Sequence, residues 1–190
     1  MIDARQRRTR EALFKALDQL LEERPFREIS VRELTDRAGI GRQTFYRHFD
    51  GLGMMLERRL ETDLAEQRAI VELPEVRALG FVEWVLRVLE FGFAGVAEAP
   101  HLYRVILSGE AGGGALARYR DQIATFLAIA PPRPGGPEDR PQGELAEYAQ
   151  SFYAGAITAM LVHWIDQGCR PDAAAMSRLF LTLVVAGRPD

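Results

Sequence analysis

The stretch SVRELTDRAGIGRQTFYRHF, residues 30–49, decides the fold of the N-terminal part of this chain. Ser30, followed three residues later by Glu33, is a capping box, in which each side chain accepts a hydrogen bond from the backbone of the other residue. A short helix is therefore predicted to begin there. Ala38-Gly39-Ile40 predicts a tight turn, and residues 41–48 predict a second short helix. Two short helices joined by a glycine turn form the helix-turn-helix pattern.

A helical wheel divides the second short helix into an apolar edge and a polar face. Phe45 and Phe49 fall on the apolar edge and are expected to pack on the preceding helices. The polar face carries hydrogen-bond donors, so it suits phosphates and the base edges of a major groove. The DNA contacts predicted from this face, and from the start of the helix before it, are Arg32, Arg42, Gln43, Thr44, Tyr46, Arg47 and His48. The alternative is a structural three-helix domain whose polar face is incidental.

At these residues the sequence resembles the TetR/AcrR family of bacterial transcriptional regulators. The family pattern stands here as Ser30, Ala38-Gly39-Ile40-Gly41 and Thr44-Phe45-Tyr46-Arg47-His48-Phe49, within about residues 5–60. The resemblance implies that Arg32, Arg42, Gln43, Thr44, Tyr46 and His48 occupy DNA-contacting positions. This chain departs from the pattern twice. Gly41 replaces a serine that would cap the second helix, and Gly51-Leu52-Gly53 replaces a lysine that would contact phosphate.

The rest of the chain predicts further helices and no strand. Ala, Leu, Arg and Glu recur at spacings of three and four, and alternating β-branched runs do not occur. We expect an all-α protein, with an N-terminal three-helix helix-turn-helix DNA-binding domain at residues 1–50. A C-terminal helical domain for ligand binding and dimerisation is expected at residues 51–190. A helix at about 51–73 would connect the two, and the proline-rich residues 131–143 predict a mobile loop.

Two long apolar helices are predicted near the C-terminus, at about residues 144–167 and 172–186. The first is apolar nearly all round, and such a helix must be covered on every side. One pair from each of two copies would form a four-helix bundle, so a homodimer is predicted. The alternative places both helices inside the core of a monomer. A two-fold dimer predicts a palindromic operator on double-stranded DNA, with the two recognition helices in successive major grooves.

The resemblance also implies an effector pocket among the C-terminal helices. Pockets of this kind are mostly apolar with a few polar groups. The ligand-binding residues predicted here are Trp84, Phe91, Tyr103, Phe126, Phe152, His163 and Trp164. We expect an unknown small molecule, apolar or aromatic, whose binding releases the protein from DNA. Repression is what the resemblance implies.

Composition and motifs exclude several other classes of protein. Arg and Lys total 24 against 27 Asp and Glu, so the chain is not a uniformly basic nucleic-acid binder. A single cysteine, Cys169, excludes an internal disulfide and suits the cytoplasm, where we expect the protein to be. No cofactor, metal site, catalytic residue or membrane partner is predicted. The 18-residue uncharged run at 148–165 contains polar residues, so a buried helix explains it better than a membrane span.

Rival functions remain open from the sequence. An enzyme would need a catalytic cluster, but His48, His101 and His163 lie far apart and no nucleotide- or metal-binding motif occurs. A helical dimer with a degenerate DNA-binding face would act through a protein partner instead. A redox role for Cys169 is a third idea, because the neighbouring Arg170 would lower its pKa.

Overall fold

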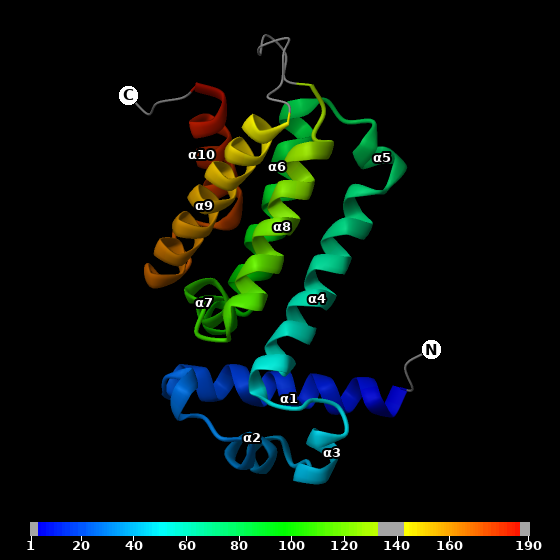
Figure 1. Ribbon diagram of the computed structural model, residues 1–190, viewed down its shortest axis with the longest axis vertical. Coiled ribbons are helices and arrows are strands. Elements are labelled where there is room, and N and C mark those ends of the chain that lie inside the picture. The colour runs from blue at the N-terminus through cyan, green and yellow to red at the C-terminus, as the bar shows by residue number, and fades with distance from the viewer. Residues whose placement is uncertain (1–3, 133–142, 187–190) are drawn as a thin grey trace. The chain divides into compact units, whose positions relative to one another are not determined.

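The computed structural model describes residues 4–132 and 143–186, and all regular structure within these ranges is helical (Figure 1). The predicted all-α fold is therefore confirmed. Of the proline-rich segment expected to form a mobile loop, residues 133–142 lie outside the described residues. No helix in the described ranges combines the length and the apolar character needed to cross a bilayer.

The N-terminal helices begin and end close to the predicted boundaries. Helix α1 spans Ala4–Glu23, α2 spans Val31–Ala38 and α3 spans Arg42–Tyr46, with a short 3₁₀ helix η1 at Phe26–Glu28. The capping box forms at the start of α2. Gly39 ends α2 with a φ of 65°, a left-handed conformation that glycine adopts without a steric penalty. The helix-turn-helix pattern read from the sequence is thus present in the fold.

The remaining helices include those predicted at about residues 51–73, 144–167 and 172–186. They are α4 (Leu52–Val71), α5 (Pro74–Arg77), α6 (Phe81–Glu98), α7 (Pro100–Ser108), α8 (Gly113–Ile129), α9 (Glu144–Asp166) and α10 (Ala173–Ala186). The apolar periodicity of residues 75–97 predicts one helix, whereas the structure has two. The break occurs where Gly80 adopts an extended conformation, with φ −70° and ψ 168°, and becomes the N-cap of α6.

The chain folds into two compact units. One contains Met1–Glu61 and His101–Leu116, and the other contains Thr62–Pro100 and Ala117–Asp190. The first unit therefore extends beyond the expected boundary at residue 50, since it also takes in the start of α4, all but the first residue of α7 and the start of α8. Helices α4 and α8 each continue from one unit into the other.

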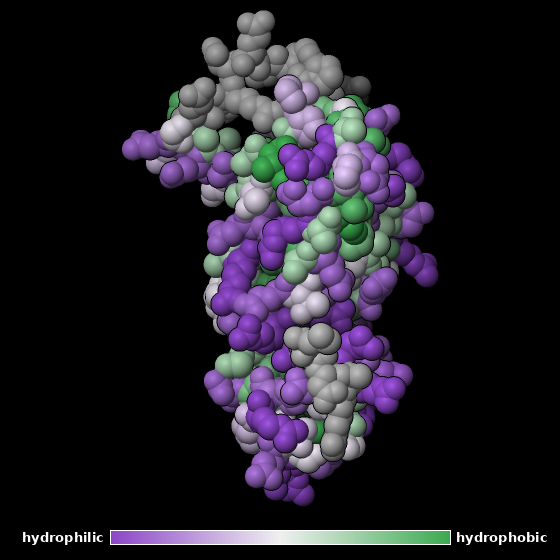
Figure 2. Space-filling model, turned by 90° about the vertical axis from the view of Figure 1, so that its right-hand side faces the viewer, coloured by the Kyte–Doolittle hydropathy of each residue, from purple (hydrophilic) through white to green (hydrophobic). Residues whose placement is uncertain are grey.

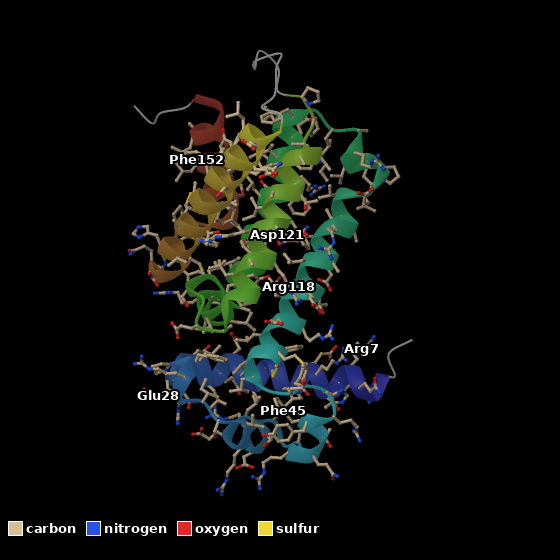
Figure 3. All side chains as sticks on the ribbon, viewed as in Figure 1. Arg7, Glu28, Phe45, Arg118, Asp121 and Phe152 are labelled. Carbon is tan, nitrogen blue, oxygen red and sulfur yellow. The ribbon has the colours of Figure 1, made fainter. Side chains whose placement is uncertain are left out.

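The core of the first unit is formed by large side chains from several of its helices. Its fully buried members include Leu13, Leu17 and Leu20 of α1, Leu34 of α2, Phe45 of α3, Met55, Leu56 and Leu60 of α4, and Leu102, Tyr103 and Ile106 of α7. Figure 3 shows Phe45 between α1 and the two short helices. Burial of each such side chain contributes about 1.5–3 kcal/mol of transfer free energy, which holds the short helices in place.

The second unit is organised around α6, α8, α9 and α10. Helix α10 packs along α6. Trp164 of α9 lies against Phe93 of α6, with the ring centroids 5.2 Å apart in an edge-to-face arrangement. The Trp164 indole N–H donates to the Pro171 carbonyl oxygen at 2.6 Å, so the one polar atom of this buried ring is satisfied. This hydrogen bond joins the end of α9 to the segment that leads into α10.

Candidate functional site

Helix α3 presents the predicted polar face to solvent. Arg42, Gln43, Tyr46 and Arg47 are exposed, and Thr44 and His48 are half-buried. Phe45 and Phe49 are 0% and 1% exposed, so the apolar edge of the wheel faces the core as expected. Helix α3 ends at Tyr46, two residues earlier than predicted, and Arg47 and His48 therefore lie in the turn that follows it.

Aromatic packing and ion pairs fix this face on its scaffold. Phe49 lies 5.6 Å from Phe45 and 6.1 Å from Phe14 of α1, measured between ring centroids. Arg37 at the end of α2 makes two hydrogen bonds to the Glu23 carboxylate of α1, at 2.8 and 2.9 Å. Arg37 therefore ties α2 to α1, and its guanidinium is engaged within the scaffold.

The cations of α3 remain available for an external anion. Arg42 and Arg47 form no ion pair with any described residue. Arg32, on the exposed side of α2, is 3.7 Å from the Asp36 carboxylate, and both side chains are more than 70% exposed. Exposed pairs of this kind are worth less than about 1 kcal/mol, so a phosphate or a guanine can compete for Arg32. Figure 2 looks onto the α3 side of the first unit, where the lower end of the surface is mostly hydrophilic.

Positive charge gathers around His48. Partial burial and the cations of Arg10 and Arg47 lower the pKa of His48 below its ordinary value. The Arg10 Nε atom is buried and has no hydrogen-bond partner in the described part of the chain. Cations gathered in this way favour the approach of an anion such as a DNA phosphate.

Of the two glycines at the start of α4, Gly53 has a steric reason in the structure and Gly51 has none. A Cβ atom added at Gly53 would lie 3.2 Å from the Ala111 carbonyl oxygen, closer than most real contacts. A Cβ added at Gly51 would meet nothing within 4 Å. Gly53 therefore allows the first turn of α4 to approach the α7–α8 connection inside the first unit. This is the position where the sequence departs from the family pattern.

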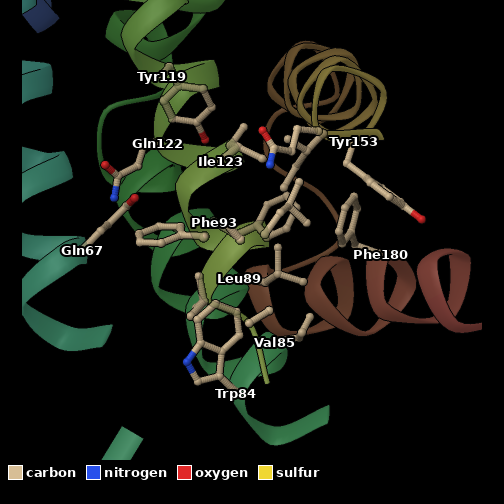
Figure 4. A pocket seen from close by; sticks show the side chains of 18 of the residues that line it. Gln67, Trp84, Val85, Leu89, Phe93, Tyr119, Gln122, Ile123, Tyr153 and Phe180 are labelled. Atoms are coloured by element: carbon tan, nitrogen blue, oxygen red, sulfur yellow. The ribbon is translucent and has the colours of Figure 1, made fainter. Parts of the chain in front are cut away.

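The second unit contains an apolar cavity of about 630 Å³ that is partly open to solvent (Figure 4). Its walls come from α4, α6, α8, α9 and α10, and no charged side chain lines it among the residues that the structure describes. The apolar lining includes Phe81, Trp84, Val85, Val88, Leu89 and Phe93 of α6, Ile123 and Phe126 of α8, Ile157 and Leu161 of α9, and Phe180 of α10. A cavity of this size and character is typical of a site for a small molecule.

The structure places the seven predicted ligand residues in different surroundings. Trp84 and Phe126 line the cavity. Phe91 is half-buried and Trp164 is buried, but neither lines it. Tyr103 is buried in the first unit. Phe152 and His163 are exposed on α9.

Five polar side chains of the cavity were not predicted from the sequence. They are Gln67 of α4, Tyr119 and Gln122 of α8, and Gln150 and Tyr153 of α9. Figure 4 shows Gln67 and Gln122 together on the side where α4 runs. Tyr119, Gln122, Ile123 and Phe126 recur at the spacing of one helix face. A polar residue inside such an apolar stripe is the signal that would have pointed to Gln122.

Helix α9 carries an exposed apolar stripe, which we call the α9 stripe. Its large members are Leu145, Tyr148 and Phe152, which are 69%, 73% and 70% exposed. The small residues Ala156 and Ala159 continue it along the same face, and both are exposed. Figure 3 labels Phe152 within this stripe. The helix expected to be covered on every side is therefore uncovered on one side in the single chain.

Cys169 does not have the surroundings of a reactive thiolate. Burial raises the pKa of its thiol, opposite to the direction expected from the neighbouring Arg170. The expectation of a lowered pKa was wrong because partial burial disfavours the charged thiolate.

Comparisons with known proteins agree with this arrangement. The family model of the bacterial regulatory proteins, tetR family, matches residues 9–52. A comparison with curated protein sequences gave no significant match. The chain is similar in structure to the regulator FadR from Bacillus subtilis, solved with stearoyl-CoA, with a TM-score of 0.70 and 16% identity over 94% of this chain and 99% of that one.

Two further solved structures share the fold. The TetR family repressor FadR from Thermus thermophilus, solved with lauroyl-CoA, has a TM-score of 0.64 and 19% identity over 95% of each chain. The dihydroxyacetone kinase operon activator DhaS has a TM-score of 0.65 and 20% identity over 94% of this chain and 95% of that one. At these identities the likeness shows the fold, while the match at residues 9–52 covers the helix-turn-helix itself. Residues 9–52 are therefore similar to the DNA-binding domain of the bacterial regulatory proteins, tetR family, and the whole chain shares the fold of solved transcriptional regulators.

Proposed function

We propose that this protein reads a palindromic operator as a homodimer and that a small apolar ligand in the second unit releases it from DNA. The observation that carries the proposal is the exposed polar face of α3 above the buried Phe45 and Phe49. The proposed action is binding alone, without catalysis. The roles of single residues, the dimer and the ligand are argued below in that order.

The side chains of α3 divide into base readers and backbone contacts. We assign base reading to Arg42, Gln43 and Arg47, because they are exposed and have donors with the geometry to pair with guanine or adenine. Thr44, Tyr46 and His48 suit phosphate contacts that fix the register of the helix in the groove. Arg32 is assigned a further base or phosphate contact from the start of α2.

The dimer is assigned to α9 and α10. The α9 stripe places Tyr148 and Phe152 in water, where such side chains are unfavourable unless a partner covers them. Ala156 and Ala159 on the same face allow a second helix to approach closely, and Leu179 of α10 is also 44% exposed. A second copy of this chain is the proposed partner, because an isologous contact uses one self-complementary face twice.

The cavity is assigned to the effector. Its lining suits an apolar molecule, and two proteins of the same fold were solved with stearoyl-CoA and lauroyl-CoA. We propose a ligand with a hydrocarbon chain or ring system that fills the space between α6, α8 and α9. About 2–3 kcal/mol of coupling between ligand and DNA binding is enough for a 30- to 150-fold loss of operator affinity. Repression is proposed as the mode of action.

The experiment is a selection of duplexes from a random library by the purified chain, followed by affinity measurements on the selected sequence. We expect a palindrome. Arg42→Ala should lower affinity by about 1–3 kcal/mol and remove the preference at one base pair of each half-site. Arg7 and Arg8 of α1 lie outside the helix-turn-helix, and we assign them non-specific attraction to the DNA backbone. Replacement of both by Ala should therefore weaken all duplexes equally and reduce the salt dependence. The log–log slope should fall by about 0.9 for each phosphate that is no longer neutralised.

The opposite results would identify a different function. If the library shows no enrichment, the chain acts through a protein partner and α3 is not a reader. If Arg42→Ala lowers affinity equally for every sequence, Arg42 contacts the backbone and base reading by this residue is wrong.

A further inference from the structure

Gln122 of α8 is a buried amide in the wall of the apolar cavity. Its side chain is only 5% exposed, and it lines the cavity with Tyr119 and Ile123 of the same helix (Figure 4). The Nε2 atom is buried and has no hydrogen-bond partner among the described residues. Leaving a buried donor unsatisfied disfavours the folded state, so such a group is expected to meet an acceptor.

Arg68 of α4 fixes the orientation of this amide. Its Nη1 atom donates to Gln122 Oε1 at 2.6 Å. A guanidinium only donates hydrogen bonds, so the oxygen end of the amide must face Arg68 and the NH₂ end is left for another partner. The bond to a cation also polarises the amide and strengthens its remaining N–H donors. Arg68 does not itself line the cavity.

The lining of the cavity limits which kind of acceptor can bind Gln122 Nε2. No charged side chain lines the cavity among the residues that the structure describes. An anionic headgroup inside it would lose its hydration without a cation in the lining to replace it. A neutral oxygen on an apolar molecule has no such penalty. Gln67, on the same side of the cavity, adds a second amide near this pole (Figure 4).

We propose that the effector is an apolar molecule with a neutral carbonyl group, such as a ketone, ester, thioester or amide, and that Gln122 Nε2 donates to its oxygen. Arg68 acts as a positioning residue that keeps the donor end of Gln122 toward the ligand. This inference rests on the proposed function of the cavity as an effector site. It goes further by stating the polar group that the effector carries and the atom that recognises it.

The test measures how three ligands of similar length displace the neutral fluorescent probe N-phenyl-1-naphthylamine from the purified chain at pH 8. The ligands are 2-decanone, which carries a carbonyl oxygen, 1-chlorononane, which lacks one, and decanoate, which is anionic. We expect 2-decanone to bind roughly tenfold more tightly than either of the others, the effect of one satisfied buried donor.

Variants at two positions separate recognition from packing. Gln122→Met keeps the size of the side chain, and we expect it to lower the affinity for 2-decanone roughly tenfold without changing that for 1-chlorononane. Gln122→Glu would accept from Arg68 and present an oxygen to the cavity, so it should prefer 2-decanol over 2-decanone. Arg68→Met leaves the amide free to turn, and a smaller loss of 2-decanone affinity is expected.

Each result decides the proposal. If the three ligands bind the native protein equally, or if Gln122→Met leaves 2-decanone unaffected, carbonyl recognition is wrong while the cavity remains an effector site. If the fluorescent probe and all three ligands fail to bind, both the effector site and this inference are wrong. The duplex selection described above would still test DNA binding independently.

Discussion

Ser30 and Glu33 hold the start of α2 from both sides. The Glu33 backbone N–H donates to Ser30 Oγ at 3.2 Å, and the Ser30 backbone N–H donates to Glu33 Oε2 at 3.0 Å. Arg24 at the end of α1 donates from Nη1 to Glu33 Oε1 at 2.8 Å. One carboxylate therefore both caps α2 and joins it to α1. The hydrogen bonds from Ser30 hold the pKa of Glu33 below its ordinary value.

Replacing Ser30 by Ala should destabilise the first unit by about 1 kcal/mol, because the α2 N-terminus loses its side-chain acceptor. Ser30→Thr should retain most of the stability, since its hydroxyl can also accept from the Glu33 N–H and donate to the Glu33 carboxylate, as the Ser30 hydroxyl does at 2.8 Å. The measurement is the urea midpoint of unfolding for the three proteins. Equal midpoints for Ala and Thr would show that the cap contributes nothing.

Adding a methyl group at Gly53 should not give the gain that an alanine normally brings to a helix. Gly95 of α6 has open space around its Cβ direction, so Gly95→Ala should stabilise the protein by about 1 kcal/mol. Gly53→Ala must push the Ala111 carbonyl oxygen from a 3.2 Å contact, which offsets this gain. Thermal unfolding of the two variants compares them. An equal rise in Tm would mean that the Gly53 contact is loose.

Protonation of His48 should strengthen DNA binding. Partial burial, Arg10 and Arg47 lower its pKa in the free protein, and a DNA phosphate nearby would raise it again. The complex therefore binds more protons, so operator affinity should rise as pH falls from 8 to below 6, by at most about tenfold per pH unit for one proton. His48→Asn should flatten this slope at constant salt, and an unchanged slope would assign the proton to another group.

Asp18 of α1 should destabilise the folded protein at neutral pH. Its Oδ1 atom is buried without a hydrogen-bond partner among the described residues, and its pKa is raised by burial and by Glu22, against the opposing effects of His101 and Arg59. A raised pKa means that the penalty is complete above the folded pKa and disappears below the unfolded one. Asp18→Asn should therefore stabilise by about 1 kcal/mol at pH 7 and by nothing near pH 3, as urea unfolding at the two pH values would show. A larger stabilisation at pH 3 than at pH 7 would contradict a raised pKa of Asp18.

Disruption of the α9 stripe should dissociate the dimer. Phe152→Glu places a charge in the centre of the proposed interface, so the protein should sediment as a monomer at concentrations where the native chain pairs. Ser151→Glu adds the same charge about 100° away around the helix and serves as the control. If Phe152→Glu remains a dimer, the chains pair through another surface.

Local signals made the DNA-binding half predictable from sequence. The start of α2 follows from Ser30 and Glu33, and the outward face of α3 follows from Phe45 and Phe49, because both depend on residues within one or two turns. The break at Gly80 was missed because the apolar periodicity continues through it. It could be found only from the extended conformation that Gly80 adopts.

The residues that line the cavity could not be predicted from sequence, because aromatic residues on these helices lie in different surroundings in the folded chain. Trp84 reaches the cavity, Tyr103 fills the core of the first unit, and Phe152 remains in water. All three sit on apolar helix faces, and only tertiary packing decides which neighbour each face receives. Gln122 was overlooked for the opposite reason, since a glutamine is usually assigned to solvent.

The apolar stripe on α9 also affects how this protein must be produced. Before any partner covers this stripe, each newly made chain exposes Leu145, Tyr148 and Phe152 to water. Formation of the proposed dimer therefore competes with aggregation of the newly made chains. We expect slow expression at low temperature to favour the proposed dimer. We expect rapid expression to high concentration to favour inclusion bodies.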